Sequence, residues 1–218
     1  MADIRPAKTI SGDPPQCQYY TVGKSMTIKQ GDPLVLWTEA TTSYRVACTI
    51  TTEQIGDTYY NSSNENCGIL GFAAHDITSD SSGNCLAQIV PSAVAAAVIP
   101  ITPIPQYTAG VPVDGIGSRY KLGVWLANND TEFKMRLTNE GSAVTVTEAY
   151  VGTAVGLYVT GTTWSASTGA TTKVGVITKV YPNDPNYNTS SAICHVAVKI
   201  MPGYQQVALG TLQDQTGP

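Results

Sequence analysis

The two histidines of the chain, His75 and His195, are the residues whose chemistry would matter most in an enzyme. Each has a neighbour that could complete part of a catalytic dyad, because Asp76 follows His75 and Cys194 precedes His195. The two histidines are far apart in sequence, and neither has a second ligand at a spacing typical of metal sites. The pattern favours hydrogen-bonded or surface histidines over a catalytic or metal-bound pair.

The carboxylates also give little sign of catalysis, since most aspartates fall in predicted turns, where they typically accept hydrogen bonds from backbone amides. The segment NNDTE at 128–132 offers oxygen ligands for calcium, but it lacks the spacing of an EF-hand loop. No nucleotide-binding, serine-hydrolase or zinc-protease motif is present. We therefore expect no catalytic residue, no bound cofactor and no metal site. The turn aspartates are Asp13, Asp32, Asp57, Asp76, Asp80, Asp114, Asp130 and Asp184.

The segment 133–180 carries the clearest structural pattern. Phe133, Met135 and Leu137 alternate with Lys134 and Arg136, which predicts a strand with one buried face. Short apolar runs follow within 144–146, 155–159 and 174–180, and the first of them should form a hairpin across a turn at 139–141. No window shows a helical apolar stripe, so this region predicts an antiparallel barrel or sandwich.

One part of that region, 160–172, is almost entirely Gly, Ser, Thr and Ala around Trp164. Such a composition cannot build a core, and we expect a loop that is mobile or ordered by a partner. A last alternating strand is expected at 193–200.

The N-terminal half also predicts short strands, at 34–37 after a Gly-Asp-Pro turn, at 44–50, and at 68–74, where glycines suggest close backbone approach. The fold class is therefore all-β, with two small antiparallel barrel or sandwich modules joined by a Pro-rich connector and flanked by extended arms. The expected boundaries are 1–22 for the N-terminal arm, 23–95 for the first module, 96–118 for the connector, 119–200 for the second barrel module and 201–218 for the C-terminal arm.

Composition narrows the function classes. Only 13% of residues are charged, the net charge is −4 and the pI is near 5.0, which argues against direct binding to a nucleic-acid backbone. No run of 18 apolar residues and no apolar signal-peptide core occur, so we expect no membrane contact and synthesis in a cytoplasm. The odd number of cysteines favours free, mostly buried thiols over disulfides. They are Cys17, Cys48, Cys67, Cys85 and Cys194.

The aromatic residues indicate surfaces. The chain has 12 tyrosines and 3 tryptophans but only 2 phenylalanines, a preference for rings that are common at interfaces. They could simply cover a small core, or they could make intermolecular contacts from arms and loops, where Tyr181 also falls. The interface candidates are Tyr19, Tyr20, Tyr59, Tyr60, Trp164, Tyr187 and Tyr204.

Two segments resemble the decoration, or cement, proteins of tailed-bacteriophage heads. The first, 24–74, contains KSMTIKQGDPLVLW, YRVACTI and GILGFAAHDI; the second, 130–200, contains DTEFKMRL, AYVGTAVGLYV, TTKVGVITKVYPNDPN and HVAVKI. The resemblance implies a structural virion protein without catalytic residues. It implies a homotrimer on the outer surface of the capsid, bound to the major capsid protein, made in the cytoplasm of a bacterial host. The terminal arms would reach neighbouring subunits, so deleting 1–22 should abolish decoration and leave the fold intact.

Two other function classes remain open. A receptor- or carbohydrate-binding β module of a phage tail or cell surface would use Trp37, Trp125 or Trp164 as stacking platforms. A small β-barrel hydrolase would need His75 or His195 to lie against a nucleophile such as Cys194 or a serine.

Overall fold

Strands make up nearly all the regular structure in the described part of the computed structural model. The remainder there consists of two 3-10 turns, Glu148–Tyr150 and Pro202–Tyr204. The chain is therefore a mostly β protein, as the sequence predicts. The expected connector at 96–118 lies outside the described residues. The described residues are 4–20, 22–23, 25–38, 45–49, 68–79, 85–86 and 122–206.

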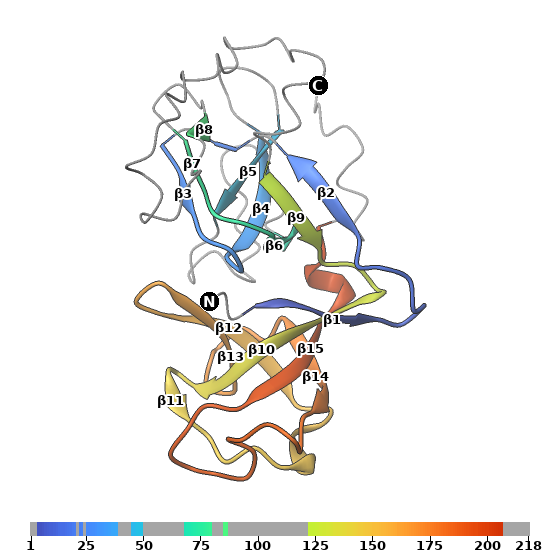
Figure 1. Cartoon of the computed structure of the whole chain (residues 1–218), viewed down its shortest axis with the longest axis vertical. Helices are drawn as coiled ribbons and strands as arrows, with labels where there is room; N and C mark the ends of the chain where they lie inside the picture. The colour runs from blue at the N-terminus through green and yellow to red at the C-terminus, as the bar shows by residue number, and fades with distance from the viewer. Residues whose placement is uncertain are drawn as a thin grey trace, which may run out of the picture.

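A closed barrel of five strands is built from the C-terminal part of the chain (Figure 1). The barrel strands are β10 (Thr131–Asn139), β12 (Ala154–Thr160), β13 (Thr163–Ser167), β14 (Gly175–Val180) and β15 (His195–Ile200). Pairing runs from β10 through β13, β12, β14 and β15 and returns to β10. The β10–β13 pair is parallel and the other four are antiparallel, so the expectation of a purely antiparallel barrel is wrong at this pair.

The barrel interior follows the predicted alternation. Phe133, Met135 and Leu137 of β10 are fully buried in one core cluster, whereas Lys134 and Arg136 are only half-buried. Strand β15 repeats the pattern, with Val196 and Val198 facing the same core. Alternate side chains of each strand therefore fill the barrel, and the others face outward.

The prediction of a loop over 160–172 is wrong for 163–167, because β13 forms there and closes the barrel. Ser165, Ala166 and Ser167 are buried. Their hydroxyls have partners: the Ser165 and Thr138 hydroxyl oxygens lie 3.0 Å apart, and the Ser167 hydroxyl accepts hydrogen bonds from three backbone amides. Ala166 faces the barrel core, whereas the two serines alternate with it and are buried on the other face of the strand, where their hydroxyls are satisfied.

The predicted hairpin is confirmed at its turn but not along its length. Glu140 and Gly141 both adopt positive φ, 49° and 87°, as a tight two-residue turn requires. The returning strand, β11 (Ser142–Ala143), has two residues and ends before the apolar run at 144–146. Val146 is instead buried in the core, and its carbonyl accepts a hydrogen bond from Asn188 N.

Two further sheets are built from the N-terminal part of the chain. The five-stranded sheet has the order β2 (Cys17–Tyr20), β9 (Leu122–Leu126), β6 (Gly71–Ala73), β4 (Pro33–Thr38) and β5 (Arg45–Thr49), and the three-stranded sheet has the order β3 (Thr27–Ile28), β7 (Ile77–Ser79) and β8 (Cys85–Leu86). The sequence placed the start of the barrel module at 119, but β9 pairs with β2 and β6 and so belongs to the five-stranded sheet and not to the barrel.

Gly71 shows why that central position suits a glycine. A Cβ at Gly71 would lie 2.1 Å from the Trp125 carbonyl oxygen on β9. No side chain fits in that space, so only glycine lets β6 approach β9 this closely. The close approach expected within 68–74 is therefore confirmed.

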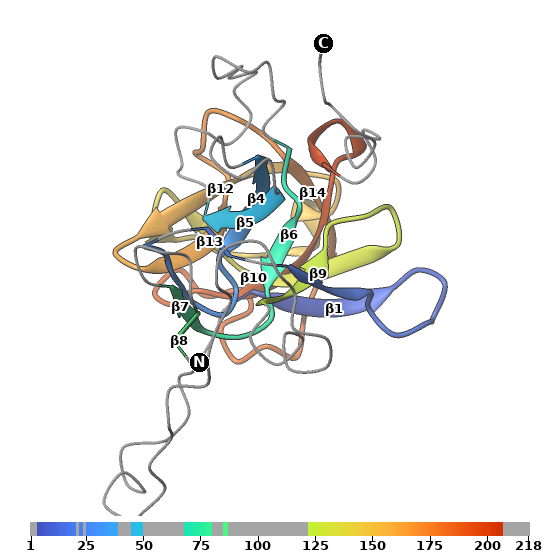
Figure 2. The ribbon, with the colours of Figure 1, turned by 90° about the horizontal axis from the view of Figure 1, so that it is seen from above.

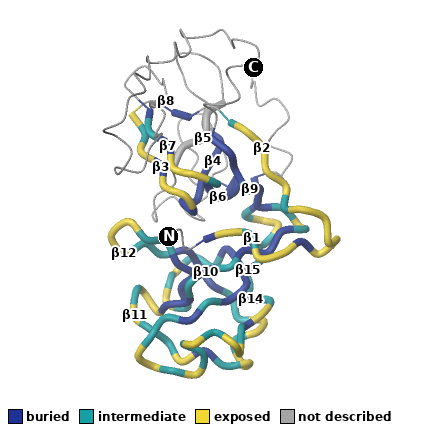
Figure 3. Tube along the Cα trace, viewed as in Figure 1, coloured by how far each residue is buried: buried dark blue, intermediate teal, exposed yellow. Residues whose placement is uncertain are grey.

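The five-stranded sheet and the barrel share a hydrophobic core. Phe72 of β6 and Phe133 of β10 are both fully buried, and Val35 of β4 lies in the same cluster. A second cluster, around Leu34 and Leu122, fills the remainder of the N-terminal sheets. Figure 3 shows buried segments of β4, β6 and β9 in the five-stranded sheet and of β10 and β15 in the barrel below it.

The N-terminal segment is not the free arm that the sequence predicts. Strand β1 (Arg5–Thr9) pairs with β10, β2 pairs with β9, and Ile4 is buried in the shared core. Backbone hydrogen bonds and an apolar anchor therefore hold this segment on its own chain. Deleting 1–22 would remove two strands, so it cannot separate decoration from folding.

The C-terminal segment is also attached to its own chain as far as Gln206. Gln205 forms a parallel bridge with Ile69, and the buried amide of Gln206 makes hydrogen bonds with both backbone polar groups of Leu36. The remainder of the predicted C-terminal arm, 207–218, lies outside the described residues.

Candidate interaction surfaces

The first candidate surface is the N-terminal segment 10–20, which consists of the connection between β1 and β2, at 10–16, and of β2 itself. It is fastened to the β9–β10 connection by the Asp130 carboxylate, which accepts hydrogen bonds of 2.8 Å from both the amide and the hydroxyl of Ser11. Backbone hydrogen bonds from Ile10 N to Asp130 O and from Leu126 N to Gln16 O fix its two ends. These hydrogen bonds lower the pKa of Asp130. The segment is thus an ordered projection, and its loop is the blue loop that follows β1 in Figures 1 and 2.

This projection displays large apolar side chains. Ile10 is 58% exposed and Tyr19 is 60% exposed, which makes them the two most exposed large hydrophobic residues in the described part of the chain. Strand β2 contains no charged residue, and three of its four residues are exposed. An exposed strand without charges is a usual place for contact with another polypeptide.

The other predicted interface residues have different fates. Tyr20 packs against the second core cluster, and Trp164, Tyr187 and Tyr204 pack against the barrel core. Each of them is only half-buried, so one part of each ring remains accessible. Tyr59 and Tyr60 lie outside the described residues. The structure therefore presents Tyr19 as the exposed member of the predicted set.

The tryptophans expected as sugar platforms do not stand free of the core. Trp125 and Trp164 both pack against the barrel cluster while remaining half-buried. The side chain of Trp37 lies outside the described residues. The carbohydrate-binding alternative gains no support from the two tryptophans that are described.

The second candidate surface is the outer face of β1, β10, β15 and β14, which we call the cationic face. Together these strands hold six Lys and Arg residues and one carboxylate, Glu132. The register places Arg5 opposite Lys134, and both Lys134 and Lys179 opposite Ala197, which makes one row across the sheet. The cationic residues are Arg5, Lys8, Lys134, Arg136, Lys179 and Lys199.

Tyr181 lies within the cationic face. The ammonium groups of Lys134 and Lys179 lie 5.2 and 5.6 Å from the centre of its ring, which fits two cation–π contacts. Burial raises the pKa of the Tyr181 hydroxyl, the Glu132 carboxylate raises it further, and Arg5 opposes them. The sequence analysis did not predict this face, although the outward positions of FKMRL and HVAVKI carry two of its lysines, Lys134 and Lys199.

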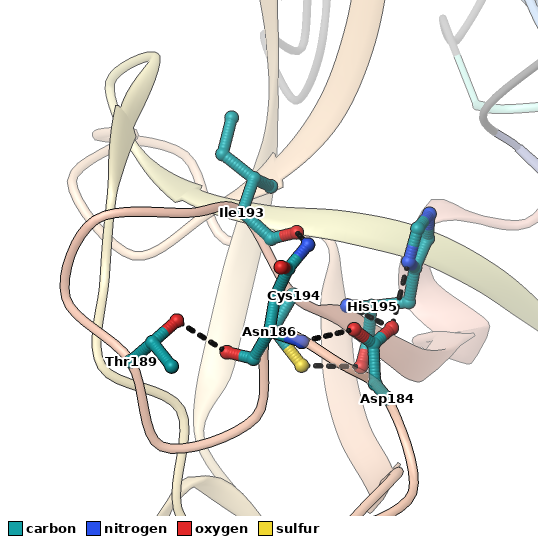
Figure 4. A network of polar contacts seen from close by, with 6 residues as sticks. All are labelled: Asp184, Asn186, Thr189, Ile193, Cys194 and His195. Carbon is teal, nitrogen blue, oxygen red and sulfur yellow. Dashed lines mark hydrogen bonds and ion pairs between the residues drawn. The ribbon is translucent and has the colours of Figure 1, made fainter.

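A third cluster surrounds Asp184 in the loop between β14 and β15 (Figure 4). The Asp184 carboxylate lies 2.9 Å from Nδ1 of His195 and accepts hydrogen bonds from the amides of Asn186 and His195. Burial by itself would raise the pKa of Asp184, but these hydrogen bonds outweigh it and the pKa is lowered. The side-chain nitrogen of Asn186, Nδ2, donates in turn to Ile193 O, so the contacts of Asp184 extend across the loop.

This Asp184–His195 pair does not extend to the expected nucleophile. Cys194 is fully buried, and its thiol faces the barrel core while the His195 ring is on the outer side of the strand. Burial, with a smaller effect from Asp184, raises the pKa of Cys194 and disfavours the thiolate. His75 is exposed at the turn after β6. The arrangement orders a loop, and it lacks the geometry of a cysteine–histidine dyad.

Four of the predicted turn aspartates, Asp32, Asp76, Asp130 and Asp184, accept hydrogen bonds from backbone amides as the sequence predicts, and Asp57, Asp80 and Asp114 lie outside the described residues. Asp32 accepts a hydrogen bond from Lys29 N, and Asp76 accepts one from Gln30 N. In the segment proposed for calcium, the Asn128 side-chain oxygen accepts from the amides of Asp130 and Thr131. Within the described ranges, no group of three or more His, Cys, Asp or Glu residues is placed to hold a metal ion.

Comparison with known proteins adds no relative. The chain matches no family model, no curated protein and no solved structure. Among the residues that the structure describes, no helix is long and apolar enough to span a lipid bilayer.

Proposed function

We propose that this protein is a structural virion protein, without enzymatic activity, that binds the outer surface of an assembled phage capsid and bridges neighbouring major capsid subunits. The observation that carries the proposal is the ordered N-terminal projection with Ile10 and Tyr19 exposed at 58% and 60%. Large apolar side chains on an ordered projection fit contact with a protein surface better than they fit chemistry on a small substrate. The resemblance of 24–74 and 130–200 to decoration proteins supports the same reading.

The physical basis of such a function is mass action. A protein that binds the assembled lattice and not the free subunit stabilises the assembled state. A homotrimer would engage several subunits at once, so the affinity of each contact could be modest. The core that the five-stranded sheet and the barrel share would then hold separate contacts at a fixed distance.

Two measurements on purified protein test the proposal. Light scattering should give a mass three times the 23.0 kDa of the chain, and the protein should co-sediment with DNA-free shells from a panel of tailed phages. A monomer that stays in the supernatant with every shell would overturn the proposal.

A matched pair of variants tests the surface itself. Replacing Ile10 and Tyr19 by alanine should reduce the fraction that pellets with shells, whereas Val151→Ala should not. Val151 is also an exposed large hydrophobic residue, at 47%, but it lies at the turn before β12. Equal pelleting of all three proteins would remove the projection from the contact.

A further inference from the structure

The cationic face has a regular construction that follows from the strand register. In β10 and β15 the inward positions are occupied by Phe133, Met135, Val196 and Val198, all fully buried or nearly so. The outward positions therefore lie on the other side of the sheet, where the strands are about 4.8 Å apart and every second residue recurs at about 7 Å. The face is a two-dimensional array of cations on a rigid surface.

The array is exposed and lightly neutralised. Arg5, Lys8 and Lys179 are exposed, and Lys134 and Lys199 are half-buried. Glu132, the one carboxylate on these four strands, lies 3.7 Å from Lys8 and is almost fully buried.

The carboxylates in the adjoining loops are already engaged. Asp130 accepts hydrogen bonds from Ser11, and Asp184 is paired with His195. These hydrogen bonds leave both carboxylates charged, so the six cations face three carboxylates, Glu132, Asp130 and Asp184, and the face keeps a net positive charge although the whole chain carries −4.

The contacts of Tyr181 favour one class of partner. Proteins that bind single-stranded nucleic acids offer aromatic rings on which bases stack. The ring on this face instead lies beneath the ammonium groups of Lys134 and Lys179, at 5.2 and 5.6 Å. Carboxylates on a protein surface need no such stacking platform, because they bind the ammonium groups directly.

We propose that the cationic face is a docking surface for an acidic polypeptide surface, with Lys134, Lys179 and Lys199 as the carboxylate-binding residues. This inference rests on the proposed function and adds the chemistry of the contact: the shell would present Asp and Glu side chains to the outer wall of the barrel. Lysine ammonium groups bind such carboxylates as point charges, so the contact is sensitive to salt.

The test uses the full chain and labelled poly-L-glutamate, followed by fluorescence anisotropy. Binding should be clear at about 50 mM salt and weak at about 500 mM, because the Debye length shortens to a few Å. The double variant Lys179→Gln/Lys199→Gln should weaken binding about tenfold. Arginine at the same two positions should retain binding, because it keeps both charges.

The matched control is Lys29→Gln/Lys173→Gln, which removes the same charge from positions outside the cationic face. Lys29 pairs with Asp76, and Lys173 donates to Thr168 O. This control should bind poly-L-glutamate like the unmodified protein. No binding by the unmodified protein, an equal loss in both double variants, or tighter binding to a single-stranded DNA of similar length would overturn the inference.

Shells separate this inference from the proposed function. Shells that bind the unmodified protein and Lys179→Gln/Lys199→Gln equally would overturn the docking surface and leave the capsid proposal standing. Shells that bind neither protein, together with the expected response to poly-L-glutamate, would overturn the capsid proposal and support the cationic face as a site for acidic proteins.

Discussion

Phe72 of β6 and Phe133 of β10 contact each other across the boundary between the five-stranded sheet and the barrel, with ring centroids 4.6 Å apart and ring planes inclined by 58°. They are the only phenylalanines of the chain. Both are fully buried, so the pair joins the two sheets through one dry contact. The sheet and the barrel should therefore unfold together.

Unfolding in denaturant tests this coupling. Phe72→Leu and Phe133→Leu should each lower the free energy of unfolding by about 1 to 2 kcal/mol, and a double-mutant cycle should give a coupling of about 1 kcal/mol. Fluorescence and circular dichroism should report one shared transition in all four proteins. Two separate transitions in the unmodified protein would contradict the shared core.

Gly156 of β12 should resist any side chain. A Cβ there would lie 2.1 Å from the Thr172 carbonyl oxygen and 2.6 Å from the Ala170 side chain, and the first of these is backbone that cannot turn away. We expect Gly156→Ala to lower the midpoint of thermal unfolding strongly, at a cost of about 3 kcal/mol. Gly203→Ala is the control, because nothing lies within 4 Å of its Cβ position. Similar midpoints of thermal unfolding for the two variants would show that the backbone around β12 shifts to accommodate the added methyl group.

The buried amide of Gln206 should matter more than its place near the end of the chain suggests. Its oxygen accepts from Leu36 N at 2.7 Å and its nitrogen donates to Leu36 O at 2.8 Å. Gln206→Met keeps the length and leaves both backbone groups without that partner, so we expect a loss of about 2 to 4 kcal/mol by chemical denaturation. Gln30→Met, at an exposed position, should change little. A neutral Gln206→Met would mean that water replaces the amide.

Acid should loosen the loop that Asp184 organises. Because the pKa of Asp184 is lowered by folding, its contribution is present above the unfolded value of about 3.9 and is lost as pH falls through the folded pKa. Thiol labelling of Cys194 should therefore accelerate relative to an exposed reference thiol as pH falls below about 4. Asp184→Asn should lose about 2 kcal/mol of stability at pH 7 and much of the pH dependence, unlike the exposed Asp13→Asn. If Asp184→Asn kept the same dependence of stability on pH, the acid sensitivity would come from another group.

The mostly β fold follows from local patterns that the sequence displays openly. Alternation identifies β10 and β15 through Phe133, Met135 and Val196, and a Gly-Asp-Pro turn marks the start of β4. Strand β13 was not predicted because its buried positions are Ser165, Ala166 and Ser167, and the serine hydroxyls have their partners at Thr138 of β10 and at Glu140 N in the turn after β10. A one-dimensional pattern does not contain those partners.

Surfaces were harder to predict than strands. Residue type alone made Tyr19 an interface candidate, and the structure shows that its side chain is exposed, whereas the cationic face was not predicted because its members come from strands far apart in sequence. Arg5 and Lys134 become neighbours only through the β1–β10 register, and Lys179 joins them only through β15. The net charge of the whole chain, −4, gives no indication of such a local positive patch.

The hydrogen bonds between Gln206 and Leu36 span 170 residues. A ribosome adding roughly 5 to 20 residues per second needs roughly 10 to 30 s to synthesise that interval. Throughout that time the backbone groups of Leu36 lack the Gln206 amide, although β5 and β6, which pair with β4, have already been made. Strand β4 can therefore pair with its neighbouring strands during synthesis, but its last hydrogen bonds form only after residue 206 has emerged from the ribosome.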